Sequence, residues 1–307
     1  MSESFLSDEV MAAVAARPET RTGLITEKHI RQFCVGVDER DPLFLDLAAA
    51  RGAGHSGVLA PPLFAAAAVR PAPHRSGLLD DGQYGDLAPP GLERLQTMLA
   101  GQAWEIGRPA VAGETVVETL LTRSITERQG ATGPIVFVEK EASLATPDGE
   151  LIERCVSTLI LRRPPPPRPP FEGDAVPSGV REQRPMTEIS PDGLIKRPDM
   201  VSLFMFCAAI WAVHRIHWDT PFAQSEGLPL PILPGWMVAS YLAQAARLRA
   251  PAAGRLQRLA VRYKGMAHPG DTLACAARDD GSAGLSLSVV NQHGAELSSG
   301  QASFVSA

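Results

Sequence analysis

The pattern of hydrophobic and polar positions along the chain predicts two groups of three strands. Each segment is rich in β-branched and apolar residues that alternate in part with polar ones, which is typical of a strand with one buried face. Turn residues at 129–133 and 147–149 separate the members of the first group. The predicted strands span residues 116–125, 135–144 and 151–161, and then residues 272–277, 285–290 and 300–305.

A helix is predicted ahead of each group. Residues 237–249 are rich in Ala and Leu and contain no interior Gly or Pro, a composition that favours a helix. Their small apolar side chains suit a buried position, and residues 63–69 form a shorter counterpart in the first half. One helix followed by a long antiparallel sheet, twice, predicts an α+β architecture.

The order of motifs also repeats, which indicates a duplicated fold with different loop lengths. The corresponding positions are 173 residues apart for Phe44 and His217, 174 for Ala60 and Pro234, and 157 for Gly113 and Gly270. A run of prolines at 164–167, 169 and 170 divides the halves, because such a run continues neither a helix nor a strand. We therefore expect an N-terminal half at 1–163, a Pro-rich linker at 164–184 and a C-terminal half at 185–307.

Composition narrows the class of protein. The 307 residues are 45% hydrophobic and carry a net charge of −5 without a Lys/Arg-rich run, so nucleic acid is not an expected partner. No apolar stretch is long enough to span a bilayer, and the N-terminus lacks the features of a secretion signal. The four cysteines form no CxxC pair. Together these features predict a cytoplasmic protein with reduced, buried thiols and neither disulfides nor zinc.

Candidate chemistry concentrates in the stretch from Trp211 to Asp219. His214 and His217 stand three residues apart in an otherwise apolar run, and no carboxylate occurs in the ten residues before His217. Histidine takes and gives protons near neutral pH, so the pair suggests acid–base work. A metal site made of the two histidines and Asp219 is possible by ligand type, but no fourth ligand is evident. Asp219 more readily caps a helix that begins at Thr220.

Several motifs resemble the MaoC-like dehydratases and hydratases, which have a hot-dog fold, and the resemblance covers nearly the whole chain. The motifs are Gly36-Val-Asp-Glu-Arg-Asp-Pro-Leu-Phe-Leu-Asp46, Gly57-Val-Leu-Ala-Pro-Pro62, His214-Arg-Ile-His217-Trp-Asp219 and Pro269-Gly-Asp-Thr272. The similarity is greatest to the branch that acts on mesaconyl-type or itaconyl-type CoA thioesters. It implies a double hot-dog fold, reversible hydration of a 2-enoyl thioester without a metal or other cofactor, and a homodimer.

The family's site residues carry over only in part. His217 matches the catalytic histidine and Gly235 matches the glycine whose N–H binds the thioester oxygen. Ala212 stands where the family has an Asp or Asn, and Pro234 stands where it has a histidine. In the first half the histidine position is Phe44, so the resemblance implies that only the second half is catalytic.

Each of these assignments has a structural alternative. His217 and His214 could be core histidines, and Gly235 could be an ordinary first residue of a helix. Glu39 and Asp38, at the acid position of the first half, are expected to be solvated loop carboxylates. Five residues are predicted to bind substrate, either around the acyl group or at the phosphates of a CoA tail, with core packing or a solvated strand edge as alternatives: Trp211, Trp218, Trp236, Arg262 and Lys264.

The sequence thus predicts a hydro-lyase that acts on an acyl-CoA or acyl-carrier thioester, with His217 as the acid–base group, His214 as its partner and Gly235 as the oxyanion donor. Two rivals stay open because Ala212 and Pro234 replace expected site residues. One is isomerase- or epimerase-type chemistry on a thioester or polyketide-like substrate. The other is a non-catalytic protein that binds an acyl thioester.

Overall fold

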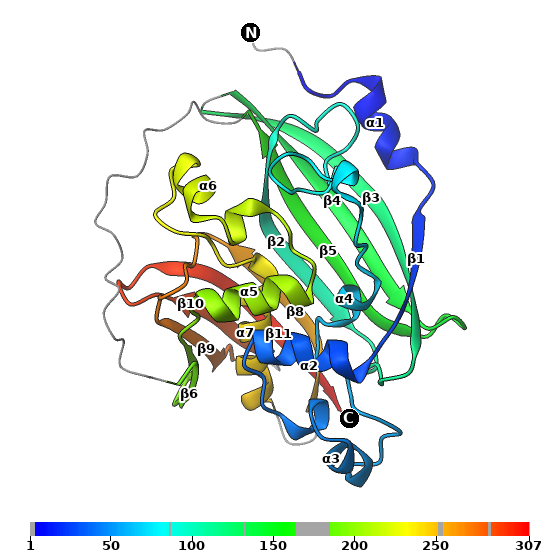
Figure 1. Ribbon diagram of the computed structural model, residues 1–307, viewed down its shortest axis with the longest axis vertical. Coiled ribbons are helices and arrows are strands. Elements are labelled where there is room, and N and C mark those ends of the chain that lie inside the picture. Colours follow the sequence, from blue (N-terminus) through cyan, green and yellow to red (C-terminus); the bar gives the residue numbers. More distant parts are fainter. Residues whose placement is uncertain are drawn as a thin grey trace.

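The computed structural model describes residues 4–85, 87–131, 133–163, 185–250, 254–281 and 284–306 (Figure 1). The predicted linker at 164–184 lies outside these residues. The described part forms one antiparallel sheet with helices packed on it. Its strands run, from one edge to the other, in the order β1 (Glu19–Leu24), β3 (Thr115–Gly130), β4 (Gly133–Ala145), β5 (Leu151–Arg162), β2 (Gln96–Ile106), β8 (Gly254–Tyr263), β11 (Glu296–Ser306), β10 (Gly284–Val290), β9 (Leu273–Asp279), β7 (Gly193–Lys196) and β6 (Thr187–Ser190).

All six strands predicted from the sequence are present, and most are longer than predicted. β3, for example, reaches Gly130, five residues beyond the predicted end at Ile125. Two central strands, β2 and β8, were not predicted. β2 contains Gly101 and few β-branched residues, and its position is decided by pairing with distant strands, which a local pattern does not reveal.

The pairing of β2 with β8 joins the two halves of the chain into one sheet. Its register runs from Gly101 opposite Arg262 to Glu105 opposite Arg258. A Cβ atom on Gly101 would lie 2.9 Å from the carbonyl oxygen of Val261, so the seam needs glycine at this point.

Two helices of ten residues lie side by side across the seam, α2 (Glu27–Gly36) and α5 (Met200–Ala209) (Figure 1). A Cβ on Gly36 would lie 2.8 Å from the Cα of Phe206, so the absence of a side chain sets how close the helices approach. The remaining helices are α1 (Asp8–Ala15), α3 (Leu47–Gly52), α4 (Ala65–Val69), α6 (Thr220–Ser225) and α7 (Gly235–Leu248), with 3-10 turns at Pro42–Phe44, Arg75–Gly77 and Arg215–His217.

In each half the sheet packs on one of these helices, as in a hot-dog fold. α7 has 14 residues, is buried from Met237 to Ala246 and packs against β7, β8, β9 and β10. Its counterpart α4, predicted to be shorter, has only five residues and packs against β1, β3 and β4.

The duplication extends to backbone detail at the constant offset of 173 residues. Asp38 follows α2 with φ of 48°, and Trp211 follows α5 with φ of 53°. This left-handed conformation costs roughly 1–2 kcal/mol for a residue other than glycine. In both copies the next N–H, that of Glu39 or Ala212, donates 2.8 Å to a carbonyl five residues earlier. The predicted repeat is therefore a repeat of the structure.

The core lies between the sheet and the helices and includes residues of both halves. Phe33 contacts Phe64, Phe206 and Trp236 through ring contacts of 5.4 to 6.1 Å between centroids. The cysteines are buried and free, as predicted, and burial raises the pKa of each thiol to about 12: Cys34, Cys155, Cys207 and Cys275.

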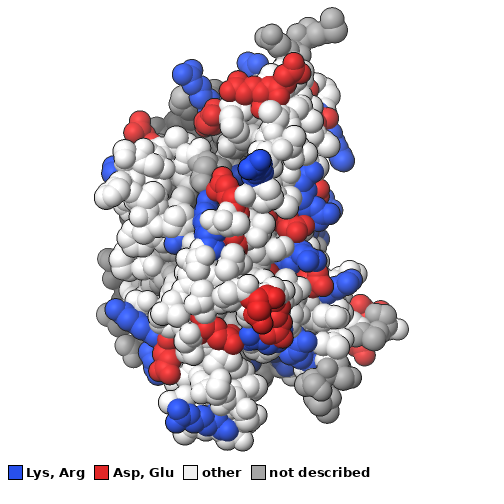
Figure 2. Space-filling model, turned by 90° about the vertical axis from the view of Figure 1, so that its right-hand side faces the viewer, with Lys and Arg blue, Asp and Glu red and all other residues white. Residues whose placement is uncertain are grey.

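Acidic and basic side chains are interspersed on the face of the molecule shown in Figure 2. Ion pairs cross neighbouring strands, as between Arg123 and Glu141 (3.3 Å) or Arg154 and Glu105 (2.8 Å). Separately, none of the described helices combines the length and the apolar character that a membrane span requires.

Lys196 is a fully buried cation that links the halves. From β7 its Nζ donates 2.8 Å to the carbonyl of Val37, at the end of α2, and 2.7 Å to Oγ1 of Thr187. The ammonium also lies 5.0 Å from the ring centroid of Tyr241 on α7. A buried charge persists only when such partners compensate its lost hydration.

Replacing Lys196 with Met should lower the free energy of unfolding by about 2–4 kcal/mol, because buried acceptors lose their donor. Urea denaturation followed by circular dichroism measures the change. Lys264→Met is the matched control. Lys264 pairs with Glu296 at 2.5 Å on the exposed surface, so that change should cost less than about 1 kcal/mol. Equal effects of the two substitutions would contradict the structural role of Lys196.

Candidate functional site

A 3-10 turn at Arg215–His217 sets the position of the candidate catalytic histidine. Asp219 ends this turn and begins α6, since its side chain accepts the N–H of Phe222 at 3.1 Å and pairs with Arg215 at 2.8 Å. The predicted capping role of Asp219 is therefore confirmed.

His217 has a defined hydrogen-bonding partner on one side of its ring. Its Nδ1 lies 2.8 Å from the carbonyl oxygen of Ile232, so Nδ1 carries the proton and Nε2 keeps its lone pair. Burial lowers the pKa of His217 to about 4, against the effect of the hydrogen bond to Ile232 and with help from the charges of His214 and Arg70. At neutral pH the ring is a neutral base.

His214 lies beside His217 and connects it to the other half of the chain. The two rings meet edge-on with centroids 5.8 Å apart. His214 Nε2 is 3.4 Å from a carboxylate oxygen of Asp81 and 3.4 Å from the amide nitrogen of Gln83. Sequence reasoning missed Asp81, which follows no motif. It supplies a carboxylate next to His214, although none occurs in the ten residues before His217.

Asp81 is held in its ionised form. Burial opposes its ionisation, but hydrogen bonds from His214 and from the N–H of Gln83 outweigh burial, so the pKa of Asp81 lies below its ordinary value. The carbonyl of Asp81 also accepts the N–H of Arg215 at 2.7 Å. A Cβ on the next residue, Gly82, would lie 2.3 Å from the carbonyl oxygen of Val213, so this loop lies directly against the histidine segment.

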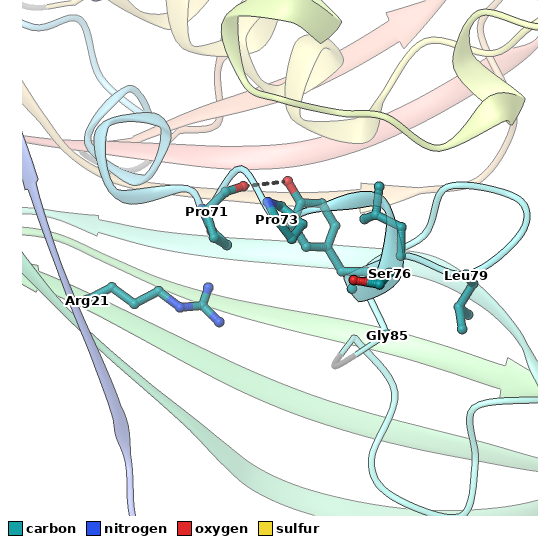
Figure 3. Close-up of a pocket in the computed structure, with 9 residues that line it drawn as sticks. Arg21, Pro71, Pro73, Ser76, Leu79 and Gly85 are labelled. Carbon is teal, nitrogen blue, oxygen red and sulfur yellow. Dashed lines mark hydrogen bonds between the residues drawn. The ribbon is translucent and has the colours of Figure 1, made fainter.

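A cavity of about 410 Å³ lies on the same loop (Figure 3). The Tyr84 hydroxyl lies 3.0 Å from the carbonyl oxygen of Pro71 and 2.9 Å from that of Trp211. Arg21 extends from β1 into the space below Pro71 in Figure 3. Tyr84 thus ties the loop to the residue that begins the histidine stretch.

Gly235 is the first residue of α7, and Pro234 precedes it without a side-chain cap. The N–H of a first helical residue has no acceptor within its own helix and lies at the positive end of the dipole. A Cβ on Gly235 would lie 2.8 Å from the ring of Tyr263. Ala212 packs against the core and offers no polar group. The roles of His217, His214 and Gly235 in catalysis stay predictions.

The five residues predicted to bind substrate lie in different environments. Trp211 and Trp218 are 44% and 46% exposed, whereas Trp236 packs between Phe33 and Phe206 and donates its ring N–H to the carbonyl of Leu63 at 2.9 Å. Trp236 therefore lies among core side chains. Arg262 is exposed on β8, and Lys264 is paired with Glu296. Their roles in binding stay predictions.

A larger cavity, of about 900 Å³, surrounds Phe44, the counterpart of His217 in the N-terminal half. Neither His217 nor His214 lines it. At its wall Arg247 of α7 pairs with Glu39 at 2.9 Å and with Asp41, and its guanidinium lies 4.5 Å from the centroid of the Phe44 ring. The prediction that Glu39 is a solvated loop carboxylate was wrong, since its side chain is only 9% exposed and pairs with an arginine of the other half.

The part of the chain that the structure describes contains no cluster of three or more His, Cys, Asp or Glu side chains arranged to hold a metal ion. His214 and His217 interact with each other and with Asp81 and Ile232 instead. These contacts suit proton transfer.

Comparisons with known proteins find similarity to a dehydratase family model and to a CoA hydratase. Residues 12–154 match the family model described as FAS1-like, dehydratase domain region. A UPF0336 protein of Parafrankia sp. is 30% identical over 150 residues, which are 47% of this chain and 87% of that protein. Mesaconyl-C(4)-CoA hydratase of Chloroflexus aurantiacus is 30% identical over 192 residues, which are 61% of this chain and 64% of that enzyme.

Solved structures give the fold. A MaoC-like dehydratase from Phytophthora capsici superposes with a TM-score of 0.70 at 17% identity, over 97% of this chain and 99% of that one. A Mycobacterium tuberculosis protein described as having a double hotdog fold superposes with a TM-score of 0.60 at 16% identity, over 94% and 96%. The predicted double hot-dog fold is therefore confirmed.

The ring of His217 should stay neutral until the pH falls to about 4, well below the ordinary histidine value of about 6.5. Because the unfolded chain binds this proton more readily, the contribution of His217 to stability is full above about pH 6.5 and is lost as the pH falls toward 4. NMR of ¹⁵N-histidine-labelled protein measures both the titration and the Nδ1–H tautomer. Protonation of His217 above pH 6 would contradict the assignment.

Proposed function

Because the chain belongs to the MaoC-like family of hot-dog dehydratases and hydratases, we propose that it hydrates a 2-enoyl thioester, or dehydrates a 3-hydroxyacyl thioester in the reverse direction. The observation that carries the proposal is the state of His217. Its Nδ1–H donates to the carbonyl of Ile232, its Nε2 has no hydrogen-bond partner among the residues that the structure describes, and its low pKa keeps it neutral. A neutral, oriented imidazole is the base that activation of water requires.

In the proposed reaction Nε2 of His217 takes a proton from water as the water oxygen bonds to the β-carbon of the substrate. The C=C electron pair moves to the α-carbon and the thioester oxygen, and the imidazolium then returns a proton to the α-carbon. One water is consumed and a 3-hydroxyacyl thioester forms. The same steps in reverse release water from that product.

The negative charge that develops on the thioester oxygen needs a donor. We assign this role to the N–H of Gly235, at the positive end of α7, a helix of 14 residues. Gly235 follows Ile232, the partner of His217, by three residues, so one segment orients the base and presents the donor.

The carboxylate missing at Ala212 is replaced, in our proposal, by Asp81. The family's acid and histidine hold water together, whereas here Asp81 orients His214 and His214 lies edge-on to His217. A neutral imidazole can donate at one nitrogen and accept at the other. His214 can therefore hold the attacking water in place of the lost acid.

The acyl carrier is CoA or a carrier protein, with Arg262 and Lys264 as the basic side chains proposed to meet its phosphates and the exposed Trp211 and Trp218 beside the acyl group. The name of the Chloroflexus relative suggests a mesaconyl-type acyl group as the first substrate to test. A homodimer is a further prediction from the family resemblance, and a cytoplasmic location is a further prediction from the composition.

Replacing His217 with Ala should lower the rate of enoyl-CoA hydration by at least about 100-fold, because the general base is lost. Loss of absorbance of the conjugated thioester measures the reaction over a panel of enoyl-CoAs. His293→Ala is the matched control, since His293 lies exposed in the turn before β11 and should leave the rate unchanged. An undiminished rate of hydration by a folded His217→Ala protein would contradict the proposal.

Replacing Asp81 with Asn should lower kcat by roughly 10–100-fold, because His214 loses its ionised partner. Adding Ala212→Asp to that variant should restore part of the rate by supplying an acid at the family's own position. The kcat and KM of both variants measure the effect. Full activity of Asp81→Asn would show that Asp81 has only a structural role in its loop. A folded double variant no faster than Asp81→Asn would argue against water binding beside Ala212.

A further inference from the structure

The cavity around Phe44 has the size and lining of a ligand site. Its volume of about 900 Å³ lies in the range of small-molecule pockets, and its walls are mainly apolar. The aliphatic side chains of Leu59, Ile106, Ile152 and Leu256 line it together with the Phe44 ring. Residues of both halves line it, and Phe44 stands at the position that corresponds to His217.

Glu153, on β5, is a buried acid in the wall of this cavity. It is 3% exposed, and its Oε1 has no hydrogen-bond partner among the described residues. The carboxyl accepts one hydrogen bond, from the N–H of Leu63. A buried polar atom without a partner is rare and calls for an explanation.

The other half has a different group at the corresponding point. Glu153 lies four residues after the turn glycine Gly149, and Ser298 lies four residues after the turn glycine Gly294. Both side chains are buried. The N-terminal half therefore carries a carboxyl group where the C-terminal half carries a small hydroxyl.

The other charged side chains in the wall already have partners. Arg247 forms ion pairs with Glu39 and Asp41. The second carboxylate oxygen of Glu39 accepts hydrogen bonds from the backbone N–H groups of Arg40 and Asp41. The remaining pairs are Arg40 with Asp38, Arg108 with Glu114 and Glu150, and Arg255 with the carbonyl oxygens of Ile106 and Gly107. Among the described residues, Glu153 is the carboxyl group of the wall that has a buried oxygen without a hydrogen-bond partner.

We propose that this cavity is a second ligand site, for an acyl compound with an uncharged carbonyl group. Its chain packs against Phe44 and the aliphatic wall. Its carbonyl oxygen accepts a hydrogen bond from the protonated carboxyl of Glu153. This site is separate from the His217 site and does not depend on the proposed hydration.

The protonation of Glu153 supports a donor role. Burial, and to a smaller extent the nearby charge of Glu118, raise its pKa to about 8 against the effect of the Leu63 N–H. At neutral pH one oxygen accepts from Leu63 and the other carries a proton. A carboxylic acid kept neutral by an apolar site is a hydrogen-bond donor to a carbonyl.

The test uses a saturated probe, the octanoyl thioester of N-acetylcysteamine, which has no double bond to hydrate. Isothermal titration calorimetry with the full chain should give binding that Glu153→Leu weakens by tenfold or more. Glu153→Gln should bind within about threefold of the parent protein, because an amide both donates and accepts as the neutral acid does. Glu153→Gln also removes a buried ionisable group, so this variant should fold, and a loss of binding in it would contradict the donor role even where Glu153→Leu does not fold.

Three further arms identify the ligand class and the location. His217→Ala should keep the affinity unchanged, and its loss would mean that the probe binds at the other site. Octanoate should bind at least tenfold more weakly than the thioester. Tighter binding of octylamine than of the thioester would show an ionised Glu153 and a cation site. Thioester binding that is unchanged by Glu153→Leu would show that the ligand does not use Glu153. Either result overturns the proposal.

Discussion

The pairing of β2 with β8 is the constraint on which the rest of the structure depends. It fixes the register of one half against the other over five residue pairs and leaves a single continuous sheet. Several contacts cross from one half to the other under this register. Lys196 reaches Val37, Trp236 reaches Leu63, and the carbonyl of Asp81 receives the N–H of Arg215. A shift of one residue would reverse the faces of these strands and break all of these contacts together.

At the positions that the family resemblance assigns to an acid and a histidine, the two halves differ in opposite ways. The C-terminal half keeps His217 and has Ala212 at the acid position. The N-terminal half keeps an acid, Glu39, and has Phe44 at the histidine position. Each loss is accompanied by a group from the other half: Asp81 lies beside the histidines, and Arg247 neutralises Glu39 and covers Phe44. The two turns have the same backbone, because each has a residue in the left-handed conformation at the corresponding position, followed by the same backbone hydrogen bond. Duplication thus produced two dissimilar environments on one backbone plan.

The sequence predicted the fold well because the repeat and six of the strands leave local signals, whereas β1, β6 and β7 were not predicted. Alternation located β3, β4 and β5, and the position of Asp219 before Thr220-Pro221 identified a cap that the structure confirms. β2 and β8 were not predicted because their position is set by pairing with distant strands. At the site, local spacing identified the histidine pair. Asp81 escaped because only the close packing at Gly82 brings its loop to His214. Glu153 escaped because a charged residue in an alternating strand ordinarily faces solvent.

Helix α7 is shared by both sites. Its first residue, Gly235, follows the carbonyl that orients His217, and its last turn brings Arg247 to the Phe44 cavity. Fourteen residues make a rod of about 20 Å, and ten of them are buried along its length. The same rod presents its positive end to one site and its negative end to the other. A molecule bound against Arg247 would therefore touch the same buried helix that begins three residues after the carbonyl that orients His217, which is a structural link between the two sites.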